Sequence, residues 1–197
     1  MWHEVVLNRE FFALLLAIDA EIAMRVKAGR CCRCGGPLCV GHYARKPRGG
    51  KIAAAGASEL CSQRFSWCCG REGCRKRATP PSVRFLGRKV YLEGAILIAC
   101  TILPLIEQSA RAIREATGLA ARTIRRWEAW WQSVFVASAL FTELRGRVPS
   151  IDAAELPCAM IESFEGATLL AKLERAMRFL APLTTTSVAV IAHSGSR

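Results

Sequence analysis

The chain of 197 residues is 52% hydrophobic, which excludes a disordered tail and predicts at least one packed core. Its formal net charge is +12, and residues 25–126 carry 21 Lys and Arg against 5 Glu. A basic middle between nearly neutral ends is typical of a nucleic-acid-binding surface. A solvated face on a basic protein is the plainer alternative.

The first residues carry no sign of export. The apolar run 11–18 follows no basic segment and ends at Asp19, so it makes a poor signal peptide and is too short to span a bilayer. A second apolar run, 95–106, contains Pro104 and predicts a buried helix. Without an export signal, the ten cysteines favour metal binding over disulfides. We therefore expect a protein of the reducing cytoplasm with no membrane partner.

Three kinds of sequence follow one another along the chain. Phe11, Leu15, Ile18 and Ile22 recur at helical spacing, which predicts a first helix that ends at Gly29. Residues 30–90 are rich in Gly, Cys, Arg and Pro, and the alternation over 61–69 predicts a strand. From Val90 onward the pattern is helical, with helices predicted over 90–106, 109–117, 121–142, 151–166 and 168–181.

These patterns predict an α+β fold, in which small zinc-ribbon β-hairpins join a mainly α-helical bundle that contains a helix-turn-helix. The predicted segments are an N-terminal helix (1–29), a basic zinc-ribbon-like region (30–90), a helical region with the helix-turn-helix at 109–131 (91–145), and C-terminal helices with a tail (146–197).

The cysteine spacing predicts a structural Zn²⁺ site. Cys31 and Cys34 are separated by two residues and followed by two glycines, so a short turn can present both thiolates to one ion. Cys69 and Cys74 are the predicted second pair, with Cys68 as a substitute ligand. Four thiolates leave no open position for water, and such closed sites hold structure rather than catalyse.

Other arrangements of the thiols stay open at this point. Cys39 or His42 could complete a compact local site, or the cysteines could simply be buried. In the four-thiolate arrangement, Cys32 and Cys68 point away from the metal. The remaining cysteines, Cys61, Cys100 and Cys158, are interpreted as structural or buried thiols.

Residues 109–131 predict a helix-turn-helix. Ser109 can cap the first helix, Gly118 can make the turn, and Leu119 can enter the core. The second helix begins at Ala121 and would bury Ile124, Trp127 and Trp131. The plainer alternative is an amphipathic helix pair with solvated arginines. The predicted nucleic-acid contacts are Arg122, Thr123, Arg125 and Arg126 on this helix, with Arg45, Lys46, Arg48, Arg75, Lys76 and Arg77 beside the cysteine turns.

Two resemblances accompany these motifs. Residues 109–131 resemble the helix-turn-helix of transcription factors and recombinases, although Arg114 stands where that family keeps a small residue. Residues 31–77 resemble the zinc ribbons at the N-termini of bacterial insertion-sequence transposases. Gln63, Arg64, Phe65, Cys68 or Cys69, and Cys74 match that pattern, and the second cysteine spacing is longer than the family's. The resemblance implies a DNA-binding module of a mobile element, over about residues 30–131.

The chain lacks the residues of transposase catalysis. Its two aspartates, Asp19 and Asp152, cannot supply a carboxylate triad for Mg²⁺, and three histidines and two tyrosines suggest no nucleophilic site. We therefore expect a non-enzymatic, zinc-stabilised protein that binds double-stranded DNA, as an accessory or regulatory partner of a transposase or recombinase. An RNA-binding zinc ribbon and a protein-interaction adaptor are the alternatives, and the C-terminal helices could form a homodimer.

Overall fold

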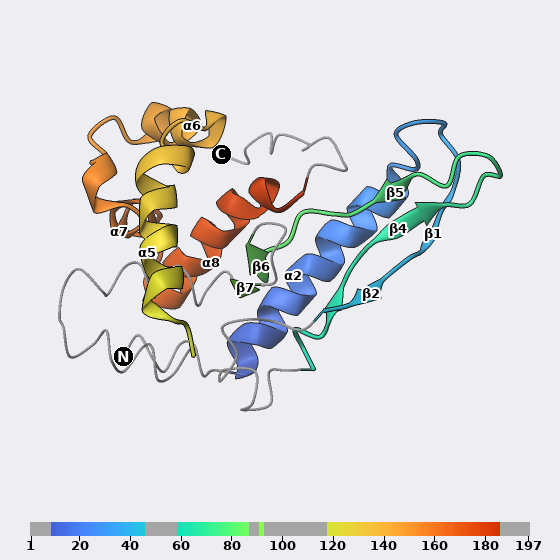
Figure 1. Ribbon diagram of the computed structural model, residues 1–197, viewed down its shortest axis with the longest axis horizontal. Helices are drawn as coiled ribbons and strands as arrows, with labels where there is room; N and C mark the ends of the chain where they lie inside the picture. The colour runs from blue at the N-terminus through green and yellow to red at the C-terminus, as the bar shows by residue number, and fades with distance from the viewer. Residues whose placement is uncertain (1–8, 46–58, 87–90, 93–117, 186–197) are drawn as a thin grey trace.

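The computed structural model describes residues 9–45, 59–86, 91–92 and 118–185. Within these ranges, helices combine with small antiparallel sheets, which agrees with the α+β prediction (Figure 1). The predicted helix 109–117, most of the predicted helix 90–106, and Lys46, Arg48 and Cys100 lie outside the described residues. In the described part of the chain, no helix combines the length and hydropathy needed to cross a bilayer.

Helix α2 (Arg9–Ala28) is the long first helix that the apolar spacing predicts. Its buried side chains follow one face, from Phe11 and Leu15 to Ile18 and Ala23. The helix ends where the Gly29 N–H donates to the Arg25 carbonyl and Arg30 takes a positive φ of 58°. This sharp end turns the chain directly into the first cysteine pair.

Residues 30–45 and 59–78, which we call the ribbon, contain two small sheets beside the C-terminal half of α2. Strands β1 (Leu38–Val40), β4 (Trp67–Cys69) and β5 (Arg77–Ala78) form an antiparallel sheet in the order β1-β4-β5. Strands β2 (Tyr43–Ala44) and β3 (Gln63–Arg64) pair separately. The predicted strand 61–69 is thus two strands, β3 and β4, interrupted at Phe65 and Ser66.

A third hairpin corrects the prediction of helix from Val90 onward. Strand β6 (Phe85–Leu86) pairs with β7 (Tyr91–Leu92), with Phe85 opposite Leu92 and Leu86 opposite Tyr91. Four residues that include Gly87 connect the strands. Aromatic residues on either side of a short glycine-containing connection favour a hairpin over a helix.

The C-terminal half is helical but more interrupted than predicted. Its elements are α5 (Ala121–Trp130), the π-helical turn η2 (Trp131–Phe135), α6 (Ala139–Arg147), η3 (Ala153–Glu155), α7 (Cys158–Glu162), α8 (Leu169–Leu180) and η4 (Ala181–Thr184). The prediction of one helix over 121–142 is wrong, because Ser138 leaves the helix and caps α6 by accepting from the Phe141 N–H. The prediction of a helix over 151–166 is also wrong, because Pro157 has no N–H to donate and restricts Leu156.

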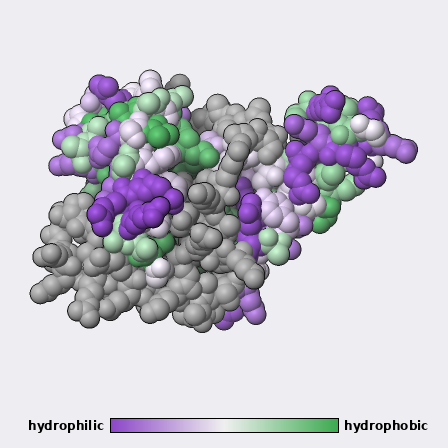
Figure 2. All heavy atoms as spheres, in the orientation of Figure 1, coloured by the Kyte–Doolittle hydropathy of each residue, from purple (hydrophilic) through white to green (hydrophobic). Residues whose placement is uncertain are grey.

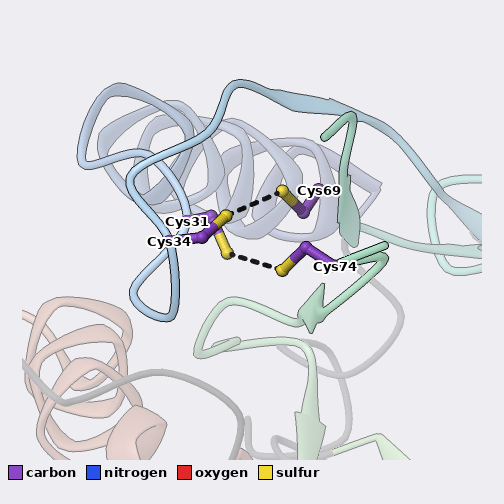
Figure 3. Close-up of side chains that lie close together, drawn as sticks. All are labelled: Cys31, Cys34, Cys69 and Cys74. Carbon is purple, nitrogen blue, oxygen red and sulfur yellow. Dashed lines mark hydrogen bonds between the residues drawn. The ribbon is translucent and has the colours of Figure 1, made fainter. Parts of the chain in front are cut away.

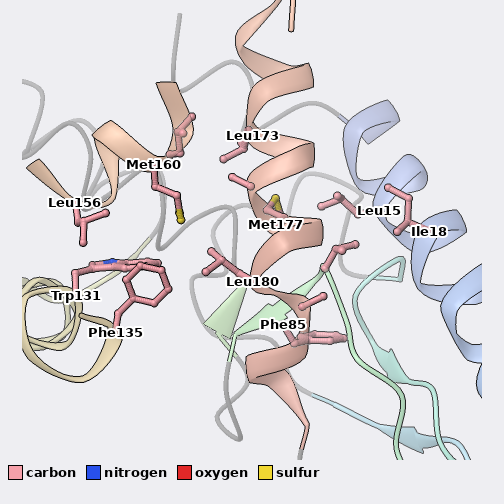
Figure 4. Close-up of a cluster of buried hydrophobic side chains, with 14 of the residues drawn as sticks. Leu15, Ile18, Phe85, Trp131, Phe135, Leu156, Met160, Leu173, Met177 and Leu180 are labelled. Atoms are coloured by element: carbon pink, nitrogen blue, oxygen red, sulfur yellow. The ribbon is translucent and has the colours of Figure 1, made fainter. Parts of the chain in front are cut away.

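Most of the apolar burial lies in one cluster, which we call the helical core (Figure 4). Trp131 and Phe135 of η2, Met160 of α7 and Met177 of α8 are completely buried there. The N-terminal half of α2 contributes Leu15 and Ile18 to the same cluster. The helical core therefore joins α2 to η2, α7 and α8.

A smaller cluster, the ribbon core, contains Ala23, Cys31, Leu38, Trp67, Cys69 and Ala78. The Trp67 Nε1–H donates to the Ala23 carbonyl over 2.9 Å, which fixes β4 against α2. The two cores thus occupy successive lengths of the same helix.

Buried Asp19 lies on α2 between the two cores. Its carboxylate accepts from the Ser82 hydroxyl (2.6 Å), the Val83 N–H (2.7 Å) and the Arg84 Nε–H (2.8 Å). Arg84 is equally buried and also donates to the carbonyls of Leu60 and Gln63. All these groups are satisfied, as a buried charge pair requires. The network ties the segment that follows the ribbon to the middle of α2.

Candidate metal centre

The first cysteine pair lies in a tight turn directly after α2. The Cys31 N–H donates to the Gly36 carbonyl (3.0 Å), and the Gly35 N–H donates to the Cys31 carbonyl (2.8 Å). Gly35 has a φ of +67°, which glycine adopts without strain. A Cβ at Gly36 would lie 3.0 Å from the Cys69 Sγ, so the second glycine lets the backbone approach the sulfurs closely. Both glycines of the motif therefore have a physical role in the turn.

The second pair lies in a longer turn between β4 and β5. The Cys69 N–H donates to the Lys76 carbonyl (2.9 Å), and the Cys74 N–H donates to the Arg71 carbonyl (3.2 Å). Gly73 has a φ of +77°, and Arg75, directly after the second cysteine, has a φ of 46°. The positive φ values of Gly73 and Arg75 let the chain reverse its direction around Cys74. The thiols of Cys69 and Cys74 therefore reach the same point although four residues separate them.

The four thiols converge at one point, as Figure 3 shows. The sulfurs of Cys31 and Cys74 lie 3.8 Å apart, and those of Cys34 and Cys69 lie 3.5 Å apart. All four sulfurs lie within 4.8 Å of one another. Tetrahedral zinc with Zn–S bonds of about 2.3 Å separates its sulfurs by about 3.8 Å. The four predicted ligands therefore lie close enough to hold one metal ion.

The protonation of the thiols agrees with such a site. The backbone N–H of Arg33, followed by that of Cys34, lowers the pKa of Cys31 to about 7 against the effect of burial. The Arg71 N–H lowers the pKa of Cys69, but burial and the neighbouring thiols together raise it to about 12. Without a cation, the thiols thus resist joint ionisation, because one thiolate discourages the next. A dication removes this repulsion, and its binding releases protons.

The alternative ligands lie elsewhere. The His42 Nδ1 lies 2.8 Å from the Ser66 carbonyl oxygen and 3.1 Å from the Ser66 nitrogen, so it bonds to the Ser66 backbone in either tautomer, and its ring packs edge-on against Phe65 and Trp67. Cys39 is exposed, and the Cys68 Sγ contacts the Arg75 carbonyl (3.5 Å). Neither thiol belongs to the cluster of four. His42 instead has a structural role, because it connects residues of the ribbon through its hydrogen bond and its ring contacts.

The other cysteines follow the predictions less uniformly. Cys32 is exposed, as expected of a residue that points away from the site. Cys61 is completely buried in the helical core, and burial raises its pKa to about 11, so the thiol stays neutral. Cys158, predicted to be a buried thiol, is only half-buried at the start of α7.

Basic side chains surround the two turns. Figure 2 shows hydrophilic residues gathered at the end of the ribbon that carries the cysteine turns, and a second group over α5. Arg75, Lys76 and Arg77 are exposed in the second turn and at β5. The Arg71 guanidinium donates to the Cys34 carbonyl (3.1 Å) and so bridges the two turns. Sequence reasoning missed this role of Arg71, although its position inside the second turn could have suggested it.

Two of the predicted contact residues, Arg45 and Arg77, also make contacts within the ribbon. The Arg45 guanidinium lies over the Tyr43 ring, 4.8 Å from its centroid. The Arg77 guanidinium lies 5.6 Å from the same centroid and donates to the Gly41 carbonyl (2.9 Å). Arg64, which carries part of the transposase resemblance, is buried and donates to the Pro80 carbonyl (2.7 Å). Arg64 therefore has a structural role.

Helix α5 presents the remaining predicted contacts. Gly118 has a φ of +64°, Leu119 is buried, and Ile124 faces the helical core. Arg122, Arg125 and Arg126 are exposed, while Thr123 is half-buried. Gly118 and Leu119 therefore lead directly into helix α5. The first helix of the predicted helix-turn-helix lies outside the described residues.

Comparison with models of known protein families, with curated proteins and with solved structures finds no match.

Proposed function

We propose that this chain is a zinc-stabilised protein that binds double-stranded DNA, as an accessory or regulatory protein of a mobile element. The observation that carries the proposal is the position of the basic residues. Arg71, Arg75 and Lys76 lie within or directly after the turn that also supplies two of the four converging thiols. A metal that orders this turn also orders the cations on it.

Zinc is the metal that suits this cluster best. Four thiolate ligands in a tetrahedral arrangement are typical of structural zinc, and iron–sulfur chemistry is the main competitor for such a donor set. With all four positions taken by protein, the ion has no place for water or substrate. Its contribution is folding energy for a ribbon that has few apolar residues.

The second support is the exposed arginine row on α5. Burial of Ile124 and Trp131 fixes which side of the helix faces the protein, so Arg122 and Arg125 project to solvent. Arginines near the N-terminus of a helix after a glycine turn suit contacts with phosphates and guanine edges in the major groove. Exposed cations on two separate elements favour a long polyanion such as duplex DNA.

Fluorescence anisotropy of the zinc-loaded chain with a mixed-sequence DNA duplex tests the proposal. Binding should weaken steeply with salt, because each neutralised phosphate releases counterions. The change Arg125→Ala should weaken binding at least about fivefold, equivalent to about 1 kcal/mol. Arg145→Ala, which removes an exposed arginine from α6, is the matched control and should have little effect.

The same titration with single-stranded RNA separates the alternatives. Tighter binding to RNA than to duplex DNA at equal salt would contradict the proposal and favour an RNA-binding ribbon. Affinity for duplex DNA that does not change between low and moderate salt would remove nucleic acid from the proposal altogether.

A further inference from the structure

Two cysteines outside the metal site face each other across the ribbon sheet. In the antiparallel pairing of β1 with β4, Cys39 lies directly opposite Cys68. Their neighbours Leu38 and Cys69 are buried in the ribbon core, so alternation along the strands places Cys39 and Cys68 on the outer face. Cys39 is exposed and Cys68 is half-buried, so small molecules can reach the pair.

The backbone spacing at this position suits a disulfide. The Gly70 N–H donates to the Pro37 carbonyl (2.8 Å), and the Gly41 N–H donates to the Ser66 carbonyl (3.0 Å). These bonded pairs lie two residues to either side of the cysteines, so Cys39 and Cys68 occupy the same kind of hydrogen-bonded pair. Opposite residues in such pairs have Cα atoms about 5.5 Å apart. That separation falls inside the range that disulfides span.

Little holds the two sulfurs in their present positions. The Cys68 Sγ makes a weak 3.5 Å contact with the Arg75 carbonyl. The Cys39 Sγ lies over Gly70, where an added Cβ would come within 2.9 Å of it. Because Gly70 has no side chain, the Cys39 sulfur has room on this face of the sheet. Rotation about the two Cα–Cβ bonds would turn the sulfurs toward each other. Because a hydrogen-bonded pair holds its Cβ atoms about 5.5 Å apart, the two strands must also approach each other by about 1 Å.

We propose that Cys39 and Cys68 are a thiol modification site that closes to a reversible cross-strand disulfide, with a low-molecular-weight disulfide such as oxidised glutathione as the oxidant. One protein thiolate attacks the glutathione disulfide and releases one glutathione thiolate. The second protein thiol then displaces the other glutathione, and the two protons that the cysteines lose go to the two leaving thiolates. Two electrons pass to glutathione, and one S–S bond breaks while another forms in the protein.

The surroundings select this pair among the described cysteines. Cys31, Cys34, Cys69 and Cys74 lie together in the metal cluster, and Cys61 is completely buried. Cys32 is exposed in the first turn and Cys158 is half-buried at the start of α7, but neither has a cross-strand cysteine opposite it among the described residues. Reaction of Cys32 with glutathione would therefore stop at the mixed disulfide.

The bond would connect the two halves of the metal site. Strand β1 follows the turn that contains Cys31 and Cys34, and β4 ends at Cys69. A covalent link between β1 and β4 keeps the two turns together when the metal is absent. The oxidised protein should therefore release zinc to a chelator more slowly than the reduced protein.

The experiment uses the full chain loaded with zinc and treated with oxidised glutathione, then alkylated, digested and analysed by mass spectrometry. We expect a peptide pair linked through Cys39 and Cys68 that is lost on treatment with dithiothreitol, with zinc retained. Cys39→Ser and Cys68→Ser should each abolish the linked pair. Cys32→Ser, the matched change of another exposed cysteine, should leave it intact.

Two results would overturn the proposal. One is a stable glutathione adduct on Cys39 in the folded, zinc-loaded protein with Cys68 still free. The other is oxidation in which disulfides of the four clustered cysteines form, and zinc leaves, before the Cys39–Cys68 link appears. Both readouts are independent of nucleic-acid binding, so they leave the proposed function to its own test.

Discussion

The two regions that share helix α2 are stabilised in different ways. The helical core joins side chains from α2, η2, α7 and α8, with Trp131, Phe135, Met160 and Met177 completely buried. Among the described residues, the buried members of the ribbon core are Ala23, Leu38, Trp67 and Ala78, together with two of the clustered cysteines. Apolar burial can support the first region by itself, whereas a region of the second size usually needs a metal or a covalent link.

This difference shows why the cysteines lie where they do. The turns that carry them contain glycines and backbone hydrogen bonds but little apolar surface, so a shared metal would be the main addition to the hydrogen bonds that Arg71 and Gly70 donate to the Cys34 and Pro37 carbonyls across the two turns. Between the regions lies Asp19, whose three hydrogen bonds connect α2 to residues 82–84. Substitutions in the ribbon, at the junction and in the helical core can test whether the two regions depend on different interactions.

Loss of a metal ligand should unfold the ribbon and leave the helical core folded. In Cys69→Ser, we expect zinc binding to be lost because one of the four thiolate ligands is missing. The ribbon should then unfold, because structural zinc contributes about 10–16 kcal/mol of folding free energy in zinc-finger peptides. Hydrogen exchange followed by mass spectrometry should show fast exchange over 31–44 and 63–78 and unchanged protection in α8. Cys32→Ser, the neighbouring exposed cysteine, is the control. Equal loss of protection in both regions would show that they do not differ in this way.

Removal of the buried carboxylate should destabilise the junction. Asp19→Ala removes the carboxylate that neutralises the buried Arg84 guanidinium, and we expect a loss of about 3–5 kcal/mol in the free energy of unfolding. Urea denaturation followed by circular dichroism measures it. Glu21→Ala, which removes an exposed partner of Arg25 on the same helix, should cost less than about 1 kcal/mol. Similar losses in both variants would argue against a special role for Asp19.

A cavity in the helical core should weaken that core without affecting the metal site. Met177 is completely buried on α8, so Met177→Ala should cost about 2–5 kcal/mol. The expected signature is faster hydrogen exchange in α5 and α8, with zinc content per chain unchanged. Zinc loss in this variant would mean that the ribbon depends on the helical core more than its own contacts suggest.

The smallest effect concerns the hydrogen bond between the ribbon and α2. Trp67→Phe keeps an aromatic ring but removes the N–H that donates to the Ala23 carbonyl. We expect a loss of about 1–3 kcal/mol, confined to the ribbon, because the lost hydrogen bond contributes about 0.5–1.5 kcal/mol and the smaller ring leaves a cavity at a buried position. Exchange rates of β4 and β5 amides measure it. Trp127→Phe provides a tryptophan change outside the ribbon, and its effect should not reach β4.

Local features of the site could be predicted from sequence because local chemistry dictates them. The two cysteine pairs, their glycines and the first helix depend on spacing and backbone freedom over a few residues. The predicted helices 121–142 and 151–166 were wrong where Ser138 and Pro157 interrupt them, although both interruptions have local causes. The hairpin of β6 and β7 needed the pairing of Phe85 with Leu92, which no helical pattern reveals.

By itself, the sequence limited the possible metal ligands to a few sets, because ligand type and spacing restrict which thiols can meet. It also determined that Arg122 lies on the opposite side of a helix from Ile124 and that Arg125 lies on its flank, because helical periodicity fixes these positions. Only the tertiary structure decided against Cys39 and His42 as ligands, and it placed Cys39 opposite Cys68. It also paired Asp19 with Arg84. These contacts join residues far apart in the chain, and their formation depends on strand register and on packing against α2, which no local pattern specifies.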